Sequence, residues 1–257
     1  MKLVTFNVNS LRARIGHVAR LVETWSPDVL CLQETKVEDG GFPHETFETL
    51  GYVHRLIHGQ RTYNGVAILS KLPLDDTIIS MSDGVNDDHA RVLSATVGGV
   101  RVVNLYVPNG QAVGTDKFHY KLQWLDRLRA FLNRFDPTQP VAVVGDLNIA
   151  PTDLDVWDPF VWEGVVLCHP TERARFAALL DWGLVDVWRE RNPFKTEFSW
   201  WDYQKMGWPR NQGLRIDHAL LSSSAQSRCS QVQILREVRG WEGASDHAPV
   251  LVTFTEP

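Results

Sequence analysis

The sequence predicts an α/β protein with two β-rich halves whose helices lie on the outside. Three observations support this: short runs of Val, Leu and Ile bounded by turn residues, amphipathic segments between them, and pairs of strand-like segments adjacent along the chain. Such apolar runs are typical of buried strands, and strands adjacent in sequence favour mixed sheets. Two sheets packed face to face, with helices outside, would bury every apolar face.

The N-terminal segment predicts a strand–helix–strand unit. One apolar run covers residues 2–7 and a second covers 28–33. Between them, apolar side chains recur at helical spacing from 10 to 25, and Ser10 stands where a helix N-cap is expected.

Alternating apolar residues mark the remaining strands, which we expect at 65–70, 92–97, 100–106, 141–145, 216–221 and 249–254. Gly98 and Gly99 predict a tight hairpin between two of them. Two more helices are expected, one with apolar residues spaced from Phe118 to Phe135, and one from Thr171 as N-cap to Gly183 as stop. Periodicity alone leaves the number of layers open.

Length and composition fit one globular domain over residues 1–257. The chain has 44% hydrophobic and 22% charged residues, which is ordinary for such a domain. No apolar stretch approaches the ~18 residues that span a bilayer, and we expect no export signal. Three widely separated cysteines fit reduced, buried thiols, so we expect a cytoplasmic protein. The net charge of −5 tells against indiscriminate binding to polyanions but does not exclude nucleic acid.

Polar residues stand at the ends of five apolar runs, where ligands of open α/β sheets gather. These residues are Asn7, Glu34, Asp146 with Asn148, Asp217, and Asp246 with His247. Because Asn7 lies near the start of the chain and His247 near its end, neither half could hold such a site alone. This is why we expect a single domain.

The residue types at these strand ends predict a hydrolase active site with a metal ion. Four acids that converge with amides and a histidine suit a hard, oxygen-ligated cation such as Mg²⁺, and no cysteine or paired histidine is placed for zinc. Asp146 and Asn148 point to the same side of an extended chain, where an acid could take a proton from water and an amide could orient that water. His247, held by Asp217, would stay protonated and bind a phosphate oxygen.

Each residue also has a purely structural interpretation. Glu34 could form an ion pair with a nearby Lys or Arg, and Asp146 with Asn148 could close a turn. Tyr106 could be a core residue whose hydroxyl is bonded locally, and Asn109 could serve only its own turn. The convergence of several such residues favours the functional interpretation.

Eight segments carry a resemblance to a known family: FNVNSLRAR (6–14), PDVLCLQETK (27–36), YNGVA (63–67), YVPNG (106–110), GDLNIAPTDLD (145–155), FSWWDY (198–203), GLRID (213–217) and SDHAP (245–249). In this order, and over essentially the whole chain, they resemble the exonuclease III family of AP endonucleases, within the endonuclease/exonuclease/phosphatase superfamily. GDLN and SDH occur across the superfamily, whereas LQETK, WWDY and GLRID are more particular to exonuclease III. The resemblance implies a four-layered α/β sandwich, with two mixed β-sheets packed face to face and helices outside.

The resemblance also implies a reaction. A Mg²⁺-dependent enzyme, with Mn²⁺ as an alternative ion, would cut the phosphodiester 5′ to abasic sites in double-stranded DNA, with 3′–5′ exonuclease and 3′-phosphatase or phosphodiesterase activity at 3′ ends. Glu34 would be the principal metal ligand, with Asn7 beside it and Asp246 supporting the site. The other roles are activation of water by Asp146, its orientation by Asn148, phosphate binding by His247 held by Asp217, and contact of Tyr106 with the phosphate or leaving oxygen.

Substrate-binding positions follow from the same resemblance. Asn109 would touch phosphate, and Trp200, Leu214 and Ile216 would form a small apolar pocket for a flipped abasic sugar, although they could instead be simple core residues. Apart from the resemblance, basic residues lie near the candidate site in the sequence and as a cluster favour nucleic-acid binding, although any single one could be a solvated surface residue: Arg12, Arg14, Lys36, Lys205, Arg210 and Arg215. We expect a monomer that does not bind membranes.

Three departures from the family pattern leave the balance of activities open. Residues 155–165 are shorter and more aromatic than the usual loop, Asn9 stands where some relatives carry a metal-binding Asp, and His218-Ala219 replaces the usual Tyr or Leu. Two other interpretations remain. A phosphoesterase of the same superfamily acting on a small phosphorylated or lipid substrate would not need the Trp200 pocket. A non-catalytic DNA-damage binding protein is disfavoured because every catalytic position is filled.

Overall fold

Two six-stranded β-sheets form the centre of the computed structural model, which describes residues 1–85 and 88–255. The first sheet has the order β11-β12-β1-β2-β4-β3 and the second β5-β6-β7-β8-β10-β9. The first contains β1 (Lys2–Asn7), β2 (Val29–Gln33), β3 (His54–His58), β4 (Val66–Ser70), β11 (Cys229–Ile234) and β12 (Val250–Phe254). The second contains β5 (Asp75–Ile79), β6 (Val92–Val97), β7 (Val100–Tyr106), β8 (Val141–Asp146), β9 (Leu184–Asp186) and β10 (Asp217–Ser222).

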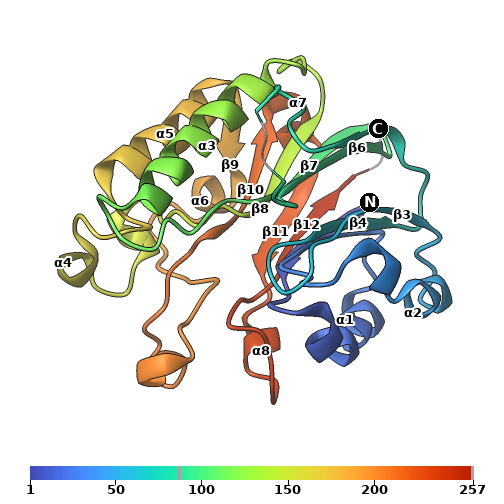
Figure 1. Cartoon of the computed structure of the whole chain (residues 1–257), viewed down its shortest axis with the longest axis horizontal. Coiled ribbons are helices and arrows are strands. Elements are labelled where there is room, and N and C mark those ends of the chain that lie inside the picture. Colours follow the sequence, from blue (N-terminus) through green and yellow to red (C-terminus); the bar gives the residue numbers. More distant parts are fainter. Residues whose placement is uncertain (86–87, 256–257) are drawn as a thin grey trace.

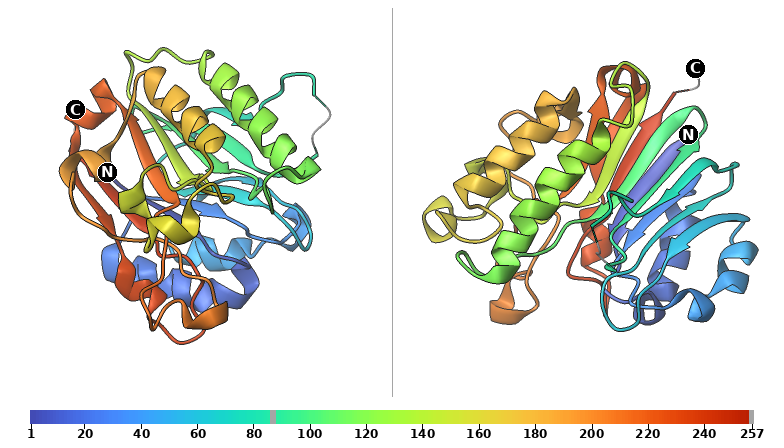
Figure 2. Two further views of the ribbon diagram at one scale, coloured as in Figure 1. Left: turned by 90° about the vertical axis from the view of Figure 1, so that its left-hand side faces the viewer. Right: turned by 45° about the horizontal axis from the view of Figure 1, so that its top comes forward.

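Helices cover the outer face of each sheet. In Figures 1 and 2, α1 and α2 lie beside the first sheet, and α3 and α5 lie side by side on the second. The helices are α1 (Leu11–Trp25), α2 (His44–Thr49), α3 (Asp116–Leu132), α4 (Pro159–Trp162), α5 (Pro170–Asp181), α6 (Val187–Arg191), α7 (Ser223–Ser227) and α8 (Arg236–Arg239). The four-layered sandwich implied by the resemblance is confirmed.

Apolar clusters fill the three spaces between the four layers. Between the sheets, Leu3 and Val29 of the first sheet pack in one cluster with Val102 and Ala142 of the second. A second cluster joins the outer face of the second sheet to α3 and α5, and a third joins the first sheet to α1. Central strands are therefore buried on both faces, which is why they appear in the sequence as near-continuous apolar runs.

Each sheet is mixed, and strand direction brings the polar strand ends together. β1 runs parallel to β2, so Asn7 at the end of β1 lies in register with Gln33, one residue before Glu34. In the second sheet β7 runs parallel to β8, which places Tyr106 beside Asp146.

The expected strands are all present, but four further strands were missed. β3, β5, β9 and β11 are the edges of the two sheets. Their residues are largely exposed or half-buried, except in short β9, so none produces an extended apolar run. The strand pattern in the sequence therefore detects the sheet centres and not the edges.

Helix ends differ from the predictions in two places. Thr171 was expected to cap the third helix, but α5 begins at Pro170 and its N-cap is His169, whose Nδ1 accepts from the Thr171 N–H at 3.2 Å. Proline is favoured at the first helical position because its fixed φ suits the helix and its missing N–H would be unpaired there anyway. Ser10 does precede α1, but its side chain makes no capping hydrogen bond. Among the described residues, no helix combines the length and apolarity that a membrane span requires.

Candidate active site

The strand ends meet at one end of the sandwich. Asp217 starts β10 directly opposite Asp146, the last residue of antiparallel β8. Asn7 bridges the sheets: its amide donates to Glu34 Oε1 and to Asp146 Oδ2, both at 2.9 Å. His247 lies within 3.8 Å of Asp146, measured from Nε2 to Oδ2. The predicted residues of both sheets therefore share one site.

Two of the predicted site residues adopt the left-handed backbone conformation that non-glycine residues rarely use. Glu34 has φ 49° and Asn148 has φ 50°, each just beyond a strand end. Hydrogen bonds from Ser10 N to Glu34 O (2.8 Å) and from Asn148 N to Asp146 Oδ1 (2.9 Å) hold these turns. Backbone strain of this kind persists only where surrounding contacts impose it, and it is concentrated at functional sites.

Asn148 is fixed on both sides of its amide. Its Nδ2 donates to Val107 O at 3.0 Å and to Asp146 Oδ2 at 3.2 Å, while its Oδ1 accepts from Asn109 Nδ2 at 3.2 Å. The sequence-based alternative, a turn closed by Asp146 and Asn148, is present as well. It serves to orient both side chains into the site.

His247 is held by a buried acid. Its Nδ1 lies 2.9 Å from Asp217 Oδ2, and the same carboxylate oxygen accepts from Ser199 Oγ at 2.7 Å. The Nε2 atom of the ring faces Asp146. The two ring nitrogens therefore each lie next to a different carboxylate, Nδ1 next to Asp217 and Nε2 next to Asp146. This arrangement presents an N–H group at the site. Ser199 was not anticipated from the sequence.

The charges of the site depend on one another. Burial raises the pKa of Asp146, and although the His247 and Asn7 side chains oppose this, it reaches about 7. Burial alone would lower the pKa of His247, but the carboxylates of Asp217 and Asp146 outweigh it and raise the value to about 10. Burial also opposes ionisation of Glu34, yet Lys36 and Asn7 lower its pKa. Asp146 is therefore the acid of the site whose protonation changes near neutral pH.

Tyr106 is kept as a neutral phenol. Burial and the nearby Glu34 carboxylate raise its pKa well above its usual value. The Arg91 guanidinium lies over its ring at 4.6 Å, and Arg91 also donates to Tyr106 O at 3.0 Å. Tyr106 therefore retains a proton that it can donate.

The donor set fits a hard cation. Glu34, Asp146 and His247 each offer an atom within 4.8 Å of the others. A protonated imidazole has no lone pair for a metal, so the oxygen atoms of Glu34 and Asp146 are the better ligands of the three. Carboxylate oxygens beside an amide suit Mg²⁺ or Mn²⁺ rather than zinc.

Asp246 lies beside this centre and organises it. Its Oδ1 accepts from Asn9 Nδ2 at 2.9 Å and its Oδ2 accepts from Trp200 Nε1 at 3.0 Å. Lys36 in turn donates to Asn9 Oδ1 at 2.6 Å and pairs with Glu34 at 2.8 Å. The expected alternative for Glu34, an ion pair, thus exists within the candidate site.

A small pocket of about 160 Å³ opens above these groups. It is lined by Glu34, Tyr106, Asn109, Asp146, Asn148, Leu167, Trp200, Ile216, Asp246 and His247. Leu214 is fully buried and does not line it, but it packs in the apolar cluster that contains Ile216 and Leu167, with Trp200 against it. Leu167, with φ 77°, was not anticipated because no strand end or motif marks it.

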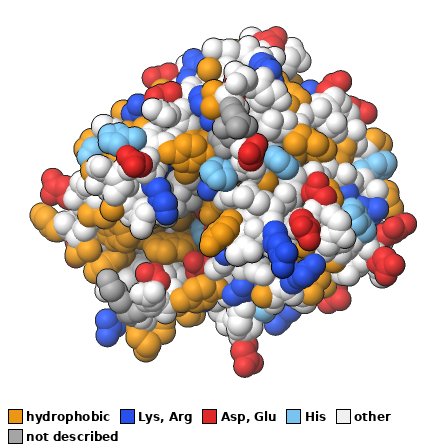
Figure 3. All heavy atoms as spheres, viewed as in Figure 1, with side chains coloured by type: hydrophobic (Ala, Val, Ile, Leu, Met, Phe, Trp, Pro, Cys, Tyr) orange, Lys and Arg blue, Asp and Glu red, His pale blue; other side chains and the backbone are white. Residues whose placement is uncertain are grey.

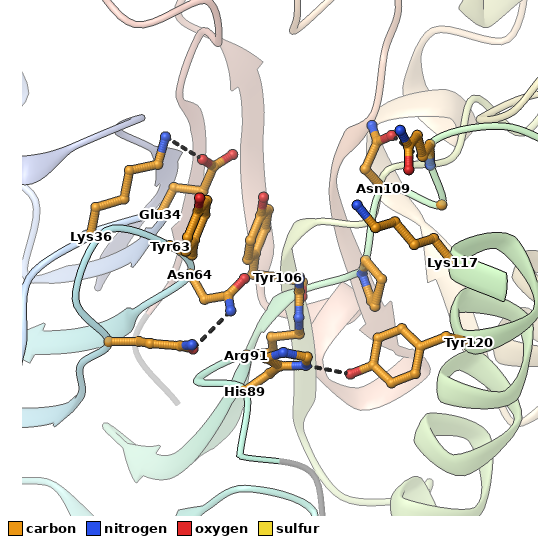
Figure 4. A pocket seen from close by; sticks show the side chains of 14 residues that line it. Glu34, Lys36, Tyr63, Asn64, His89, Arg91, Tyr106, Asn109, Lys117 and Tyr120 are labelled. Atoms are coloured by element: carbon orange, nitrogen blue, oxygen red, sulfur yellow. Dashed lines mark hydrogen bonds and ion pairs between the residues drawn. The ribbon is translucent and has the colours of Figure 1, made fainter. Parts of the chain in front are cut away.

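A larger groove of about 580 Å³ continues from the pocket and shares Glu34, Tyr106 and Asn109 with it. In Figure 4, Lys36 and Tyr63 lie on one side of this groove and Lys117 and Tyr120 on the other. Cationic and aromatic side chains along a channel are suited to the phosphates and bases of a nucleic acid strand.

The basic residues predicted near the site differ in their burial and in their partners. Arg215 is 1% exposed and pairs with Asp155 and Asp186, so it is neither a solvated surface residue nor available to the predicted basic cluster. Arg14 is bonded to Asn9 O and Tyr203, Arg12 reaches Gly41 O, and Arg210 is exposed. The side chain of Lys205 lies outside the described part of the structure. Figure 3 shows basic and acidic side chains interspersed on the face of Figure 1.

Comparison with known proteins identifies the family. Residues 4–247 match the Endonuclease/Exonuclease/phosphatase family. The chain is 38% identical to exodeoxyribonuclease III of Haemophilus influenzae, over 99% of this chain and 100% of that protein. A Neisseria 3′ phosphatase bound to a product DNA hairpin superposes with a TM-score of 0.96 at 39% identity, and an AP endonuclease of Archaeoglobus fulgidus with 0.94 at 35%, each covering 99% of both chains. The chain therefore belongs to the endonuclease/exonuclease/phosphatase family.

Proposed function

We propose that this protein is a DNA repair nuclease that hydrolyses the phosphodiester 5′ to abasic sites in duplex DNA. At 3′ ends it would also act as a 3′–5′ exonuclease and as a 3′-phosphatase or phosphodiesterase. Its relatives are named as an exodeoxyribonuclease III, a 3′ phosphatase bound to DNA and an AP endonuclease. The observation that carries the proposal is the pair of Asp146 and His247, which face each other across 3.8 Å at the pocket.

Each member of this pair has its own part in hydrolysis. Asp146 accepts a proton from the attacking water, and the Asn148 amide, fixed by Val107 and Asn109, orients that water. His247, kept cationic by Asp217, donates its Nε2 proton as a hydrogen bond to a non-bridging phosphate oxygen. The Tyr106 phenol donates to phosphate or to the leaving oxygen. Pre-positioned donors of this kind each contribute roughly 100- to 1000-fold to rate.

Mg²⁺, with Mn²⁺ as the alternative, would be held by Glu34 with Asn7 beside it and Asp246 in support. The bound cation would neutralise charge on the phosphate oxygens. The side chains present fit this role, since Glu34 is kept ionised by Lys36 and the Asn7 amide. The same contacts place Glu34 next to Asp146 through Asn7.

The 160 Å³ pocket would hold a flipped abasic sugar against Trp200 and Ile216, with Leu214 supporting the wall from behind. Extrusion from the helix costs least where no base is stacked. Asn109, which lines both the pocket and the groove, would contact phosphate. We propose that residues 1–257 act as one domain, since one core cluster contains residues of both sheets. We also propose that the protein is a cytoplasmic monomer.

A labelled duplex with one stable abasic analogue tests this function, alongside a duplex that ends in a 3′-phosphate. We expect a single nick 5′ to the lesion and release of phosphate, both abolished by EDTA and restored by Mg²⁺. Phosphate release without incision would place the protein with the 3′-end enzymes. Binding without any cleavage in Mg²⁺ or Mn²⁺ would indicate a damage-binding protein. Inactivity and no binding would turn attention to small phosphorylated or lipid substrates.

A further inference from the structure

A lysine lies completely buried behind the active site. Lys121 of α3 has no exposed surface, although the charged residues Lys117 and Asp126 of the same helix are exposed. Removing an ammonium group from water is costly unless several acceptors surround it. The partners of Lys121 therefore indicate what this residue does.

Two of its partners are backbone carbonyls of active-site residues. Lys121 Nζ donates to Asn148 O at 2.6 Å and to Asn109 O at 3.1 Å. The side chains of these two asparagines are hydrogen-bonded to each other on the pocket side at 3.2 Å. The ammonium group of Lys121 thus joins the segments of Asn109 and Asn148 through their backbone carbonyls, while their side-chain amides are bonded to each other at the pocket.

The third partner extends the same connection to the wall of the pocket. Glu172 of α5, also without exposed surface, forms an ion pair with Lys121. Its Oε1 accepts from Leu167 N at 3.2 Å and its Oε2 from His169 N at 3.1 Å. Leu167 lines the pocket in a left-handed backbone conformation. The pair therefore bonds to three separate pocket segments through their backbones.

The loop at Gly110 packs closely against the side chain of Lys121 and restricts its position. Gly110 has φ 92°, and a Cβ there would approach Lys121 Cδ to 3.0 Å, so the loop after Asn109 is closed against the lysine stem. The carbonyl of Asn148 is presented by a residue whose φ of 50° is itself strained. A strained turn needs surroundings that over-determine it, and the Lys121 hydrogen bond is one of these.

A second ion pair between α3 and α5 provides a comparison with the Lys121–Glu172 pair. Arg175 of α5 pairs with Asp126 of α3 at 2.9 Å, with side chains 28% and 59% exposed. Arg175 also donates to Leu122 O and Thr171 O, which belong to the helices themselves. This pair joins the same two helices as Lys121 and Glu172, but in the described part of the structure none of the hydrogen bonds of Arg175 reaches a residue that lines the pocket.

We propose that Lys121 is a positioning residue for hydrolysis, whose ammonium group, paired with Glu172, sets the placement of Asn148 and Asn109. This inference rests on the proposed nuclease function. It predicts that loss of the pair lowers the rate of the chemical step by more than it weakens DNA binding. The expected decrease is roughly 10- to 100-fold, as is common for groups that orient residues contacting the reacting atoms.

Three variants test it. Lys121→Met removes the charge and leaves Glu172 buried and unpaired, so its melting temperature should fall by roughly 10 °C. Lys121→Met with Glu172→Gln removes both charges together and should recover much of that loss. Arg175→Met is the matched control at the same helix pair. The abasic duplex is cut under single-turnover conditions with enzyme in excess, because that rate constant does not depend on the fraction of enzyme that is folded.

The expected result is a 10- to 100-fold slower single-turnover rate in both Lys121 variants, with the dissociation constant for DNA within about threefold of wild type. Arg175→Met should keep the wild-type rate. Hydrogen exchange should rise at 107–110 and 147–149 in both Lys121 variants. A double variant that cuts at the wild-type rate would overturn the positioning role. If wild type itself does not cut, the proposed function fails instead, and the exchange measurement alone then decides whether Lys121 holds these segments.

Discussion

His247 and Asp146 face each other across 3.8 Å, and each is bonded on its other side to a different partner. Asp217 holds the histidine at 2.9 Å, while Asn7 donates to the aspartate at 2.9 Å. The carboxylates of Asp217 and Asp146 bias the imidazole toward its charged form, while burial, opposed by His247 and Asn7, raises the pKa of the Asp146 carboxyl to about 7. An acid that can accept a proton and a cation that can bind phosphate are the two groups that phosphodiester hydrolysis requires at close range.

Asp217→Asn should slow cleavage of abasic DNA by roughly 100- to 1000-fold at neutral pH. Asp217 helps raise the pKa of His247 to about 10, so the histidine is charged below that pH and loses its charge above it. Without the carboxylate this pKa falls, and activity should decline at lower pH than in wild type. A pH–rate profile of both proteins checks this, with Ser199→Ala as a milder change at the same carboxylate. An alkaline limb at the same pH in wild type and Asp217→Asn would contradict the assignment.

Metal binding should release a proton around neutral pH. The pKa of Asp146 is raised to about 7, so below that pH its carboxyl is neutral, and above it the negative charge strengthens the attraction for a cation held nearby by Glu34. Titration of Mn²⁺ at pH 6 and pH 8, in buffers of different ionisation enthalpy, should show tighter binding at pH 8. The pH dependence should shrink in Asp146→Asn. Equal affinity at both pH values in wild type would count against Asp146 as the titrating neighbour of the metal.

Trp200 should contribute through its ring and through its N–H separately. Trp200→Phe keeps an aromatic wall but removes the 3.0 Å hydrogen bond to Asp246, whereas Trp200→Ala removes both. We expect the alanine variant to lose most of its incision at abasic sites and the phenylalanine variant to lose less. Leu214→Ala should chiefly destabilise the fold, by about 2–5 kcal/mol, because this residue is fully buried behind the pocket. Unchanged incision by Trp200→Ala would remove Trp200 from the pocket assignment.

Arg215→Met should destabilise the protein by about 3–5 kcal/mol, because it removes the cation that pairs with both Asp155 and Asp186 and leaves Asp155 with Arg189 alone. Burial opposes ionisation of both acids, but Arg215 outweighs it and their pKa values lie below the usual range. Their stabilising effect is therefore present above a pH of about 4 and lost as the pH falls below it. Urea unfolding at pH 7 and pH 3.5 should show a smaller difference between variant and wild type at the lower pH. A difference that grows on acidification would be incompatible with this ion-pair network.

The sequence was sufficient for the sheet centres and for the acidic site, for one physical reason. Strands such as β1 and β8 are buried on both faces, so their composition is distinctive, and their ends carry the polar residues that must converge. Edge strands such as β5 have mainly exposed residues and no such composition. Their pairing is decided by neighbours distant in the chain.

The supporting groups of the site could not be predicted for a related reason. In the sequence, Lys121 looks like the exposed charged residues of the same helix. Only the packing of α5 against this helix reveals that Lys121 is buried. Ser199 and Leu167 reach the site through loops without periodicity. Arg215 shows the opposite case: its position near Asp217 in the sequence placed it in the basic cluster, whereas in the structure it is buried and bonded to two acids from other segments.

The most direct measurement is single-turnover cleavage of the abasic duplex by Asp146→Asn, together with its dissociation constant for the same DNA. The substitution keeps the shape of the side chain and an acceptor for Asn7 but cannot take a proton from water. We expect cleavage to slow by about 10²–10⁴-fold, as for loss of a general base, while DNA binding stays within a few-fold of wild type. Cleavage at a rate comparable to wild type would show that another group activates the water.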